Sequence, residues 1–206
     1  PPRSTLYPYT TLFRSRSLTK IGDLAFYNCT MLSSISIPDA VTSIGRSAFD
    51  GCTSLTSVST TTQSKLQSIG REAFNNCRFS SFKTGNDLKS IGALAFANNQ
   101  NLKTVILSEN LSAIGDSAFL NRSALETLTL KGTFTVIPIR MLYSCSSLTK
   151  VVLPQSVTEI KLRAFEGCTK LATLGLAGTN EDADFLLSPN LKIIGEYAFS
   201  SCKALK

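Results

Sequence analysis

The sequence predicts an α/β solenoid, a right-handed coil of about 7–8 stacked units made of short parallel strands and short helical turns. Three observations lead to this fold class. A nine-residue segment, IGDLAFYNC at Ile21–Cys29, returns in near copies along the chain. Its phenylalanine recurs at steps of 22 to 25 residues, followed by one step of 34. Between the copies, apolar residues alternate as in strands that bury one face.

The phenylalanine position defines the units. It is occupied in order by Phe26, Phe49, Phe74, Phe96, Phe119, Leu142, Phe165 and Phe199. A single unit cannot bury enough apolar surface to offset the entropy of ordering its backbone, so a unit is expected to fold only against its neighbours. We therefore expect one continuous core, with the phenylalanines in a single file along its long axis.

A short strand is predicted before each copy of the nine-residue segment. In the unit that contains Phe49, Ile35 and Ile37 share one face by alternation, and Leu32 leads into them. The same spacing recurs at Leu102-Val105-Leu107, Leu125-Leu128-Leu130, Leu148-Val151-Leu153 and Leu171-Leu174-Leu176. Strands that return at this period are expected to pair in parallel with the strands of the neighbouring units.

A short helix is predicted within the nine-residue segment. After Gly45, the apolar residues Ala48, Phe49 and Cys52 fall on one face of a helical turn. The residue two positions after each phenylalanine is mostly asparagine or glycine, which tolerate the left-handed conformation that ends a helix. The glycine that follows isoleucine is expected at the helix start without positive φ, because Pro138 replaces it in one copy.

The domain prediction separates a leader from one solenoid. Residues 1–15 carry no copy of the repeat, and the stretch LYPYTTLFRS resembles a translated sequencing adapter. We treat residues 1–15 as a non-native leader and exclude them from functional reasoning. Residues 16–206 are expected to form a single solenoid, truncated at both ends, with an insertion near 178–188.

Composition excludes several functional classes. The chain has 206 residues, of which 43% are hydrophobic, and it has a formal net charge of +7. The leader contributes Arg3 and Arg14 and no acidic residue, so the net charge without it is +5. The lysines and arginines of the chain are scattered along the sequence, which favours a solvated surface over a nucleic-acid site. No apolar run is long enough to span a membrane. The chain contains no histidine and no supported nucleophile-and-base motif, so we expect no enzyme activity and no cofactor.

The unit I-G-x-x-A-F-x-x-C-x-x-L-x-x-I-x-I-P resembles the BspA-like class of leucine-rich repeat over residues 18–205. The resemblance implies a leucine-rich-repeat solenoid within a larger secreted or cell-surface protein that adheres to host matrix, plasma or cell-surface proteins. The chain departs from this class in its insertion and in the copy IPIRMLYSC, which lacks the phenylalanine. The resemblance transfers no catalytic or ligand-binding residue to a position in this chain.

Six cysteines occupy one position of the repeat, three residues after the phenylalanine: Cys29, Cys52, Cys77, Cys145, Cys168 and Cys202. Asn99 and Arg122 replace cysteine in the two central units. A ladder of small buried thiols is the favoured interpretation, with disulfides between stacked neighbours as the alternative. A zinc site is disfavoured because the chain has no CxxC spacing and no histidine.

Asn28, Asn110 and Asn121 match the N-glycosylation acceptor pattern. Asn28 and Asn121 stand at the predicted left-handed position, where backbone conformation already explains asparagine. Turn chemistry is therefore the favoured interpretation, and glycosylation stays the alternative.

The insertion brings three acidic residues together, Glu181, Asp182 and Asp184. Their oxygens could hold calcium, but the EF-hand spacing is missing. A solvated loop is favoured, in which the apolar residues Phe185, Leu186 and Leu187 fold back on the solenoid.

The candidate binding surface consists of the strand positions that alternate with the inward-facing ones. These positions mostly carry hydroxyl groups and little charge. They are Ser34, Ser36, Ser57, Ser59, Ser81, Lys83, Thr104, Ile106, Thr127, Thr129, Lys150, Val152 and Thr173. The alternative interpretation is that threonine suits strands and serine fills solvated positions.

The leading functional hypothesis is a non-catalytic protein-binding or adhesion segment of a larger extracellular or cell-surface protein, which binds a protein ligand through its exposed strands. A passive structural spacer and an intracellular protein-interaction scaffold are the alternatives. No nucleic-acid partner and no membrane insertion of this segment are expected. Exposed terminal layers of the solenoid also predict end-to-end self-association.

Overall fold

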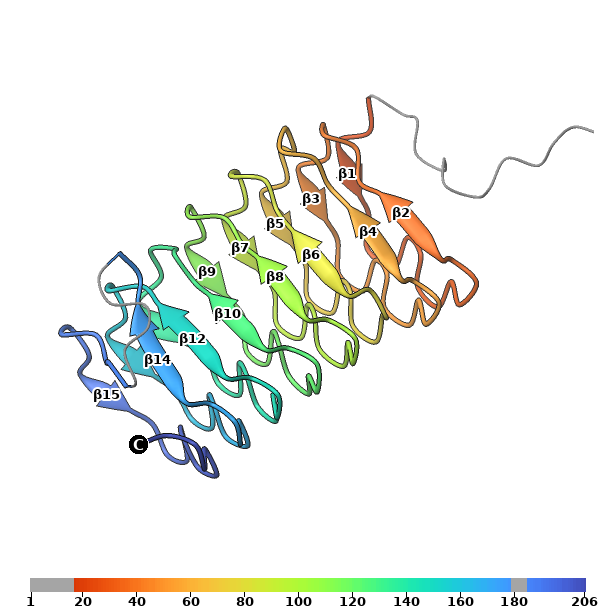
Figure 1. Ribbon diagram of the computed structural model, residues 1–206. Coiled ribbons are helices and arrows are strands. Elements are labelled where there is room, and N and C mark those ends of the chain that lie inside the picture. The colour runs from red at the N-terminus through yellow and green to blue at the C-terminus, as the bar shows by residue number, and fades with distance from the viewer. Residues whose placement is uncertain (1–16, 179–184) are drawn as a thin grey trace, which may run out of the picture.

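The computed structural model describes residues 17–178 and 185–206, which form a solenoid of stacked turns (Figure 1). The leader at residues 1–15 and the acidic residues Glu181, Asp182 and Asp184 lie outside these ranges. Each turn contributes one longer and one two-residue strand. The longer strands are β2 (Ser34–Ser36), β4 (Ser57–Ser59), β6 (Ser81–Lys83), β8 (Thr104–Ile106), β10 (Thr127–Thr129), β12 (Lys150–Leu153) and β14 (Thr173–Leu176). The two-residue strands are β1 (Lys20–Ile21), β3 (Ser43–Ile44), β5 (Ser68–Ile69), β7 (Ser90–Ile91), β9 (Ala113–Ile114), β11 (Val136–Ile137), β13 (Glu159–Ile160) and β15 (Ile193–Ile194).

The strands form two parallel faces, each running along the axis of the solenoid (Figure 1). On one face β2 pairs with β4, and β6, β8, β10, β12 and β14 follow as one sheet. On the other face the sheets run β1-β3-β5-β7-β9 and β11-β13-β15. Residues pair with the equivalent residue of the next unit, as Ile35 does with Val58 and Ile44 with Ile69. The predicted parallel pairing of the units is therefore confirmed.

The phenylalanines form the predicted file inside the solenoid. Rings of successive units stack nearly parallel, with centroids 5.0 Å apart for Phe26 and Phe49 and 5.6 Å apart for Phe96 and Phe119. Phe165 and Phe199 stack in the same way at 5.0 Å, while the buried side chain of Leu142 replaces the ring between Phe119 and Phe165. Offset stacking of this kind adds to the burial of each ring, so the units share one core.

The predicted short helices are wrong. Within residues 17–178 and 185–206 the nine-residue segments are successions of turns and contain no helix. The N–H groups of Leu24, Phe26 and Asn28 donate to carbonyls of the next unit over 2.7–2.8 Å. Those of Tyr27 and Cys29 donate to the carbonyls three residues earlier in the chain. Half of the N–H groups thus bond along the axis, in place of the bonds to the fourth preceding residue that define a helix.

Two positions in each segment have positive φ. The one predicted from asparagine and glycine is confirmed, with φ of 55° at Asn28 and 74° at Gly51. The second lies four residues earlier, at Leu24 (58°) and Ser47 (49°), and was missed because it carries ordinary side chains. The two left-handed residues of each segment lie four positions apart, and together they turn the backbone so that alternate N–H groups face the next unit.

The glycine after isoleucine serves close axial packing. These glycines have no positive φ, as predicted, but they do not begin helices. A Cβ added to Gly70 would lie 2.6 Å from the carbonyl carbon of Gly45, and one added to Gly92 would lie 2.6 Å from that of Gly70. Backbone stacked on backbone therefore leaves no room for a side chain at these sites.

The face of two-residue strands is interrupted between β9 and β11. Elsewhere on this face, the residue after the strand donates its N–H to the unit before, as Gly115 does to the Ile91 carbonyl at 2.8 Å and Lys161 to the Ile137 carbonyl at 2.9 Å. Pro138 occupies this position after β11 and has no N–H to donate to Ile114. We call the β9–β11 boundary the seam.

The chain returns from the insertion onto the stack. Phe185 bridges to Leu174 of β14, and its ring meets that of Phe199 edge-on at 5.6 Å. Ser188 Oγ and Asn190 Nδ2 then both donate to the Gln155 carbonyl, at 2.7 and 3.0 Å. Ser108 and Asn110 donate in the same way to the Asn86 carbonyl, so the unit after the insertion resumes the regular pattern.

Candidate functional site

The thirteen predicted contact residues all lie on the longer strands, whose outward side we call the long-strand face. Eight of them are exposed: Ser36, Ser57, Ser59, Ser81, Lys83, Thr104, Ile106 and Thr127. Four are half-buried: Ser34, Thr129, Lys150 and Thr173. The strands therefore bring twelve of these side chains to one side of the solenoid.

Val152 is the exception, because its side chain is fully buried. Alternation predicts exposure only where one face of a strand meets water. Val152 pairs with Gly175 of β14, which is buried as well, so both faces of the sheet are covered at this end of β12 and β14. We exclude Val152 from the long-strand face.

The long-strand face is hollowed where β8 meets β10. The hollow has a volume of about 240 Å³. Its floor and walls come from Thr104, Val105, Ile106, Leu107, Glu109, Thr127, Thr129 and Lys131. The Ile106 side chain lies beside Thr129 in the strand register and is 50% exposed, the highest exposure of any large apolar side chain on this face. Lys131 Nζ and Glu109 Oε1 lie 3.5 Å apart at the rim.

This arrangement offers side chains that suit binding. Threonine and serine hydroxyls both donate and accept hydrogen bonds, and an exposed isoleucine offers an apolar anchor between them. The hollow therefore combines an apolar centre with a polar rim, which is the usual composition of a protein-binding surface.

Five of the six cysteines, from Cys52 to Cys202, form a ladder of hydrogen-bond donors, whereas Cys29 is exposed and departs from the predicted ladder of buried thiols. Cys52 Sγ donates to the carbonyl of Phe26 at 3.1 Å, and Cys77 Sγ to that of Phe49 at 3.2 Å. All six thiols are free. Burial raises the pKa of Cys52 and Cys202 to about 11, and it also raises the pKa of Cys77. These thiols stay protonated near neutral pH and cap carbonyls of the neighbouring unit, as a structural ladder requires.

Two residues depart from the cysteine ladder at its centre. Asn99 keeps the donor function, with Nδ2 2.7 Å from the Phe74 carbonyl, but its buried Oδ1 has no partner. Arg122 is fully buried, and none of its guanidinium nitrogens has a hydrogen-bond partner. The guanidinium lies over the rings of Phe119 and Phe96, 5.2 and 5.8 Å from their centroids. Desolvation lowers the pKa of Arg122 to about 9.

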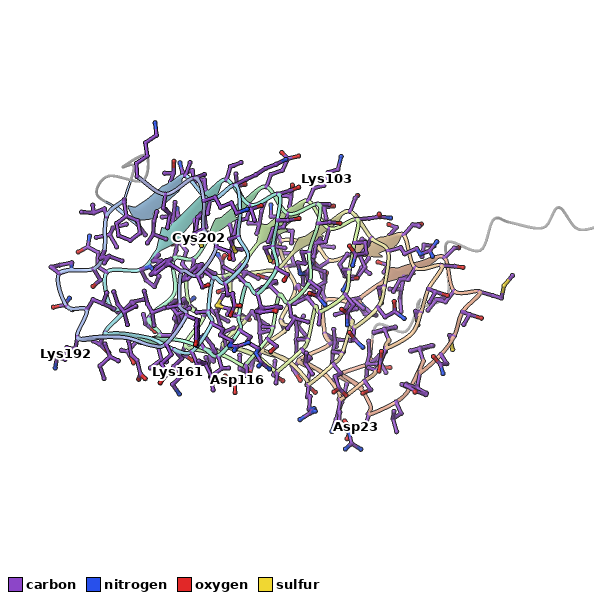
Figure 2. The ribbon with its side chains drawn as sticks, turned by 90° about the horizontal axis from the view of Figure 1, so that it is seen from below. Asp23, Lys103, Asp116, Lys161, Lys192 and Cys202 are labelled. Atoms are coloured by element: carbon purple, nitrogen blue, oxygen red, sulfur yellow. The ribbon has the colours of Figure 1, made fainter. Side chains whose placement is uncertain are left out.

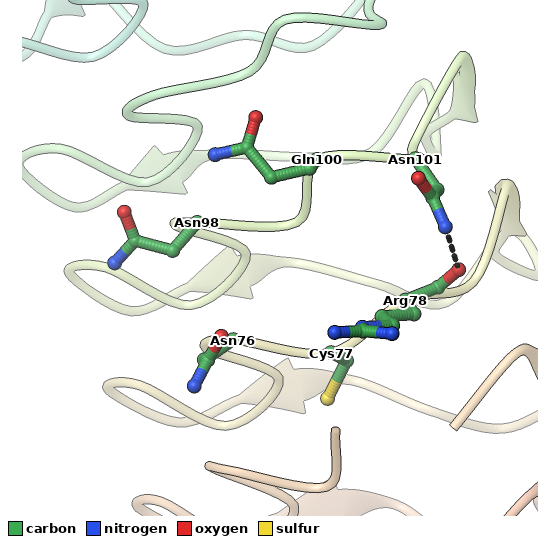
Figure 3. A pocket seen from close by; sticks show the side chains of 6 residues that line it. All are labelled: Asn76, Cys77, Arg78, Asn98, Gln100 and Asn101. Atoms are coloured by element: carbon green, nitrogen blue, oxygen red, sulfur yellow. Dashed lines mark hydrogen bonds between the residues drawn. The ribbon is translucent and has the colours of Figure 1, made fainter. Parts of the chain in front are cut away.

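A second, polar pocket lies where two of the turns lead into β6 and β8 (Figure 3). Its volume is about 310 Å³. It is lined by Asn76, Cys77, Arg78, Asn98, Gln100 and Asn101. Sequence reasoning missed this polar pocket, although the run NNQN at residues 98–101 was a usable signal, because four consecutive amide side chains occur nowhere else in the chain.

The acceptor asparagines are explained by turn geometry. Asn28 and Asn121 have φ of 55° and 57°, as predicted for the left-handed position. Asn110 Nδ2 donates to the Asn86 carbonyl at 2.9 Å. Backbone conformation and hydrogen bonding thus account for these three residues without a modification.

Charged side chains of both signs are spread over the solenoid. Asp23, Asp116, Lys161 and Lys192 follow one another along one side, and Lys103 lies on the opposite side (Figure 2). In the described part of the chain, no three His, Cys, Asp or Glu side chains converge as metal ligands. The same residues include no helix with the length and apolarity to cross a bilayer.

Comparisons with known proteins place this architecture among leucine-rich repeat proteins. No curated protein matches the chain. The structure is similar to a leucine-rich repeat protein of T. pallidum, TpLRR, with 25% identity, a TM-score of 0.63 and coverage of 92% of this chain and 72% of that one. It is also similar in fold to the pneumococcal vaccine antigen PcpA, with 21% identity, a TM-score of 0.60 and coverage of 90% of this chain and 54% of that one.

The repeat itself matches a family model. The model describes the BspA type leucine-rich repeat region and matches residues 9–76 and 67–205, with six copies. These ranges contain the strands, the stacked phenylalanines and the cysteine ladder described above. The chain belongs to the BspA-type leucine-rich repeat family.

Proposed function

We propose that the chain is a non-catalytic protein-binding segment of a secreted or cell-surface protein, and that it contacts its partner through the long-strand face. The observation that carries this proposal is the hollow between β8 and β10, where exposed Ile106 is surrounded by Thr104, Thr127 and Thr129. An apolar side chain in the centre of a polar patch is a typical anchor of a protein interface.

The stack supplies the rigidity that such a surface needs. Parallel pairing fixes each strand against its neighbours, and β10 pairs with β12 over three consecutive residues, Thr127 to Thr129. A surface that is ordered before binding loses little conformational entropy on association, which raises affinity. The solenoid therefore presents its hydroxyl groups at fixed spacing to an extended partner.

An extracellular location fits the relatives. PcpA is a pneumococcal vaccine antigen, and it shares the fold over 90% of this chain. We infer a host matrix, plasma or cell-surface protein as the partner class, since these are the proteins that a bacterial surface solenoid meets.

The test is binding of the purified chain to a panel of extracellular-matrix and plasma proteins by surface plasmon resonance. We expect at least one saturable interaction, which Ile106→Ser weakens about tenfold because burial of the isoleucine side chain is lost. Lys83→Glu on the long-strand face should also alter the association rate, since charges at an interface steer encounter.

The matched control is Lys89→Glu, which makes the same charge reversal at an exposed residue directly before β7, on the other face of the solenoid. Equal effects of Lys83→Glu and Lys89→Glu would refute the long-strand face as the binding surface. A chain that retains no protein of the panel would be a passive spacer.

A further inference from the structure

The polar pocket lies outside the hollow between β8 and β10. Asn76 and Arg78 belong to the turn that leads into β6, and Asn98 and Gln100 to the turn that leads into β8 (Figure 3). The polar pocket and the hollow have no lining residue in common. A ligand of the polar pocket would therefore be separate from the protein partner proposed above.

Two lining side chains are held in place by the neighbouring turns. Asn98 donates from Nδ2 to Asn75 Oδ1 at 3.0 Å and accepts at Oδ1 from Asn121 Nδ2 at 3.3 Å. Gln100 donates to the Asn121 carbonyl at 3.3 Å and accepts from Ser123 Oγ at 2.7 Å. An amide has two N–H groups and two acceptor lone pairs, so each of these side chains keeps one donor and one acceptor free.

Two other lining side chains make no hydrogen bond or ion pair within the described part of the chain. These are the guanidinium of Arg78 and the amide of Asn76, both exposed to solvent. Their backbones are fixed, because the Arg78 N–H donates to the Leu55 carbonyl at 3.0 Å and the Asn76 N–H to the Ala97 carbonyl at 3.0 Å. None of the six lining residues is acidic, so the Arg78 charge is not neutralised inside the pocket.

We propose that the polar pocket binds an acidic sugar of the hexuronic acid class. A guanidinium pairs with a carboxylate through two parallel hydrogen bonds, which assigns the sugar carboxylate to Arg78. The amides of Asn76, Asn98 and Gln100 each donate and accept, which matches the hydroxyl groups of a sugar ring. A volume of about 310 Å³ is at the small end of ligand pockets and suits a single ring.

The lining favours a sugar over an acidic peptide. It contains amides, one guanidinium and one thiol, and it has no aliphatic or aromatic side chain. Several common modes of peptide recognition place side chains of the peptide in apolar pockets or grooves. Adjacent hydroxyls on a sugar, in contrast, are satisfied by amides that donate and accept at neighbouring points.

The experiment is a titration of the ¹⁵N-labelled chain with D-glucuronate, D-glucose and acetate, followed by the side-chain amide signals of the pocket. We expect saturable shifts of the Asn76, Asn98 and Gln100 amides with glucuronate, and at least tenfold weaker binding of glucose and acetate. Arg78→Ala should weaken glucuronate at least tenfold, and Asn76→Gly about threefold.

Two control variants separate the pocket from general charge and backbone effects. Arg46→Ala removes one exposed cation outside the pocket, and Asn28→Gly replaces an asparagine with φ of 55° in another turn. Neither should change glucuronate binding. Glucose binding equal to glucuronate, acetate binding equal to glucuronate, an unaffected Arg78→Ala variant, or no saturable shift would each overturn the proposal. Because no variant alters the long-strand face, this result is independent of the protein-binding proposal.

Discussion

Arg122 shows how one residue can oppose the packing around it. Every other position of the ladder from Cys52 to Cys202 donates to a carbonyl of the preceding unit, whereas the Arg122 guanidinium has no hydrogen-bond partner. Its contacts with two phenylalanine rings contribute on the order of 2 kcal/mol each. They do not supply the hydrogen bonds that offset the desolvation of a buried ion, which costs several kcal/mol. Arg122 therefore lowers the stability of the central units.

Replacement of Arg122 by an apolar side chain of similar length should stabilise the solenoid. We expect Arg122→Met to raise the free energy of unfolding by about 1–4 kcal/mol, because the buried charge disappears and the volume stays filled. Urea denaturation at pH 7 measures this difference. Arg122→Lys is the control, since it keeps the charge and should bring no gain; a less stable Arg122→Met variant would show that the ring contacts dominate.

The same substitution predicts a pH dependence. The pKa of Arg122 in the folded chain is about 9, well below its ordinary value in an unfolded chain, so the folded state binds this proton less tightly. The penalty is fully present below pH 9 and fades as the pH rises above 9. The advantage of Arg122→Met should therefore shrink between pH 7 and pH 10 in urea denaturation, and an advantage that grows would contradict the assignment.

Single residues also show which backbone conformations can be predicted from the sequence and which cannot. Asn28 and Gly51 predicted a left-handed conformation correctly, because few residue types tolerate positive φ. Leu24 and Glu72 adopt the same conformation without any compositional signal. Arg78 gave no signal either, because its role depends on amides contributed by the next turn of the solenoid.

At the scale of elements, strands were predictable and the turns between them were not. Alternation at Ile35 and Ile37 identifies a strand by a local rule. The spacing of Ala48, Phe49 and Cys52 is compatible both with one helical turn and with a series of tight turns. A helix of two turns or less leaves most of its N–H and C=O groups unpaired. The next unit offers carbonyls to Ser47 and Phe49 at 2.8 Å, and these axial bonds decide the conformation.

The seam is the element boundary where local opening should occur first. The N–H groups of Ser112 and Thr158 donate along the axis at 2.9 and 2.7 Å, while that of the equivalent Thr135 has no partner within the described residues. We expect the Thr135 amide to exchange with solvent hydrogen at least tenfold faster than those of Ser112 and Thr158. Hydrogen exchange followed by NMR tests this, and equal protection of the three amides would show that the seam is closed.

At the scale of the whole molecule, the repeat period by itself predicts the architecture. One file of rings from Phe26 to Phe119 required only that equivalent residues stack. The outward side of the longer strands was predictable to a similar extent, because twelve of the thirteen residues expected there are exposed or half-buried, as alternation predicts. Val152 is the exception because its side chain is buried although it occupies an outward position of the alternation, and alternation alone does not report whether both faces of a strand are covered.

The outermost described units predict association between molecules. Ile193 is 54% exposed on β15, which pairs with β13 and has no second partner strand among the described residues. Leu24 and Met31 are exposed at the opposite end of the stack. We expect sedimentation velocity of the chain to show assembly that grows with concentration, since open sheet edges and apolar layers pair readily.

Ile193→Glu should abolish this assembly by placing a charge on the edge strand. Ile106→Glu is the matched control, because Ile106 is 50% exposed but lies in the middle of the long-strand face. A monomer at every concentration, or equal effects of the two variants, would count against association through the ends.

The return of the chain at Ser188 and Asn190 has a wider consequence. Both side chains donate to the Gln155 carbonyl, which corresponds to the Asn86 carbonyl that Ser108 and Asn110 use in a regular unit. The step from Gln155 to Ser188 spans 33 residues, whereas the step from Asn86 to Ser108 spans 22. The hydrogen-bond pattern of the units thus continues after a longer step in the sequence. We therefore expect peptide segments inserted at this step to leave the stacking of the described units unchanged, so that the solenoid accepts additional recognition segments there.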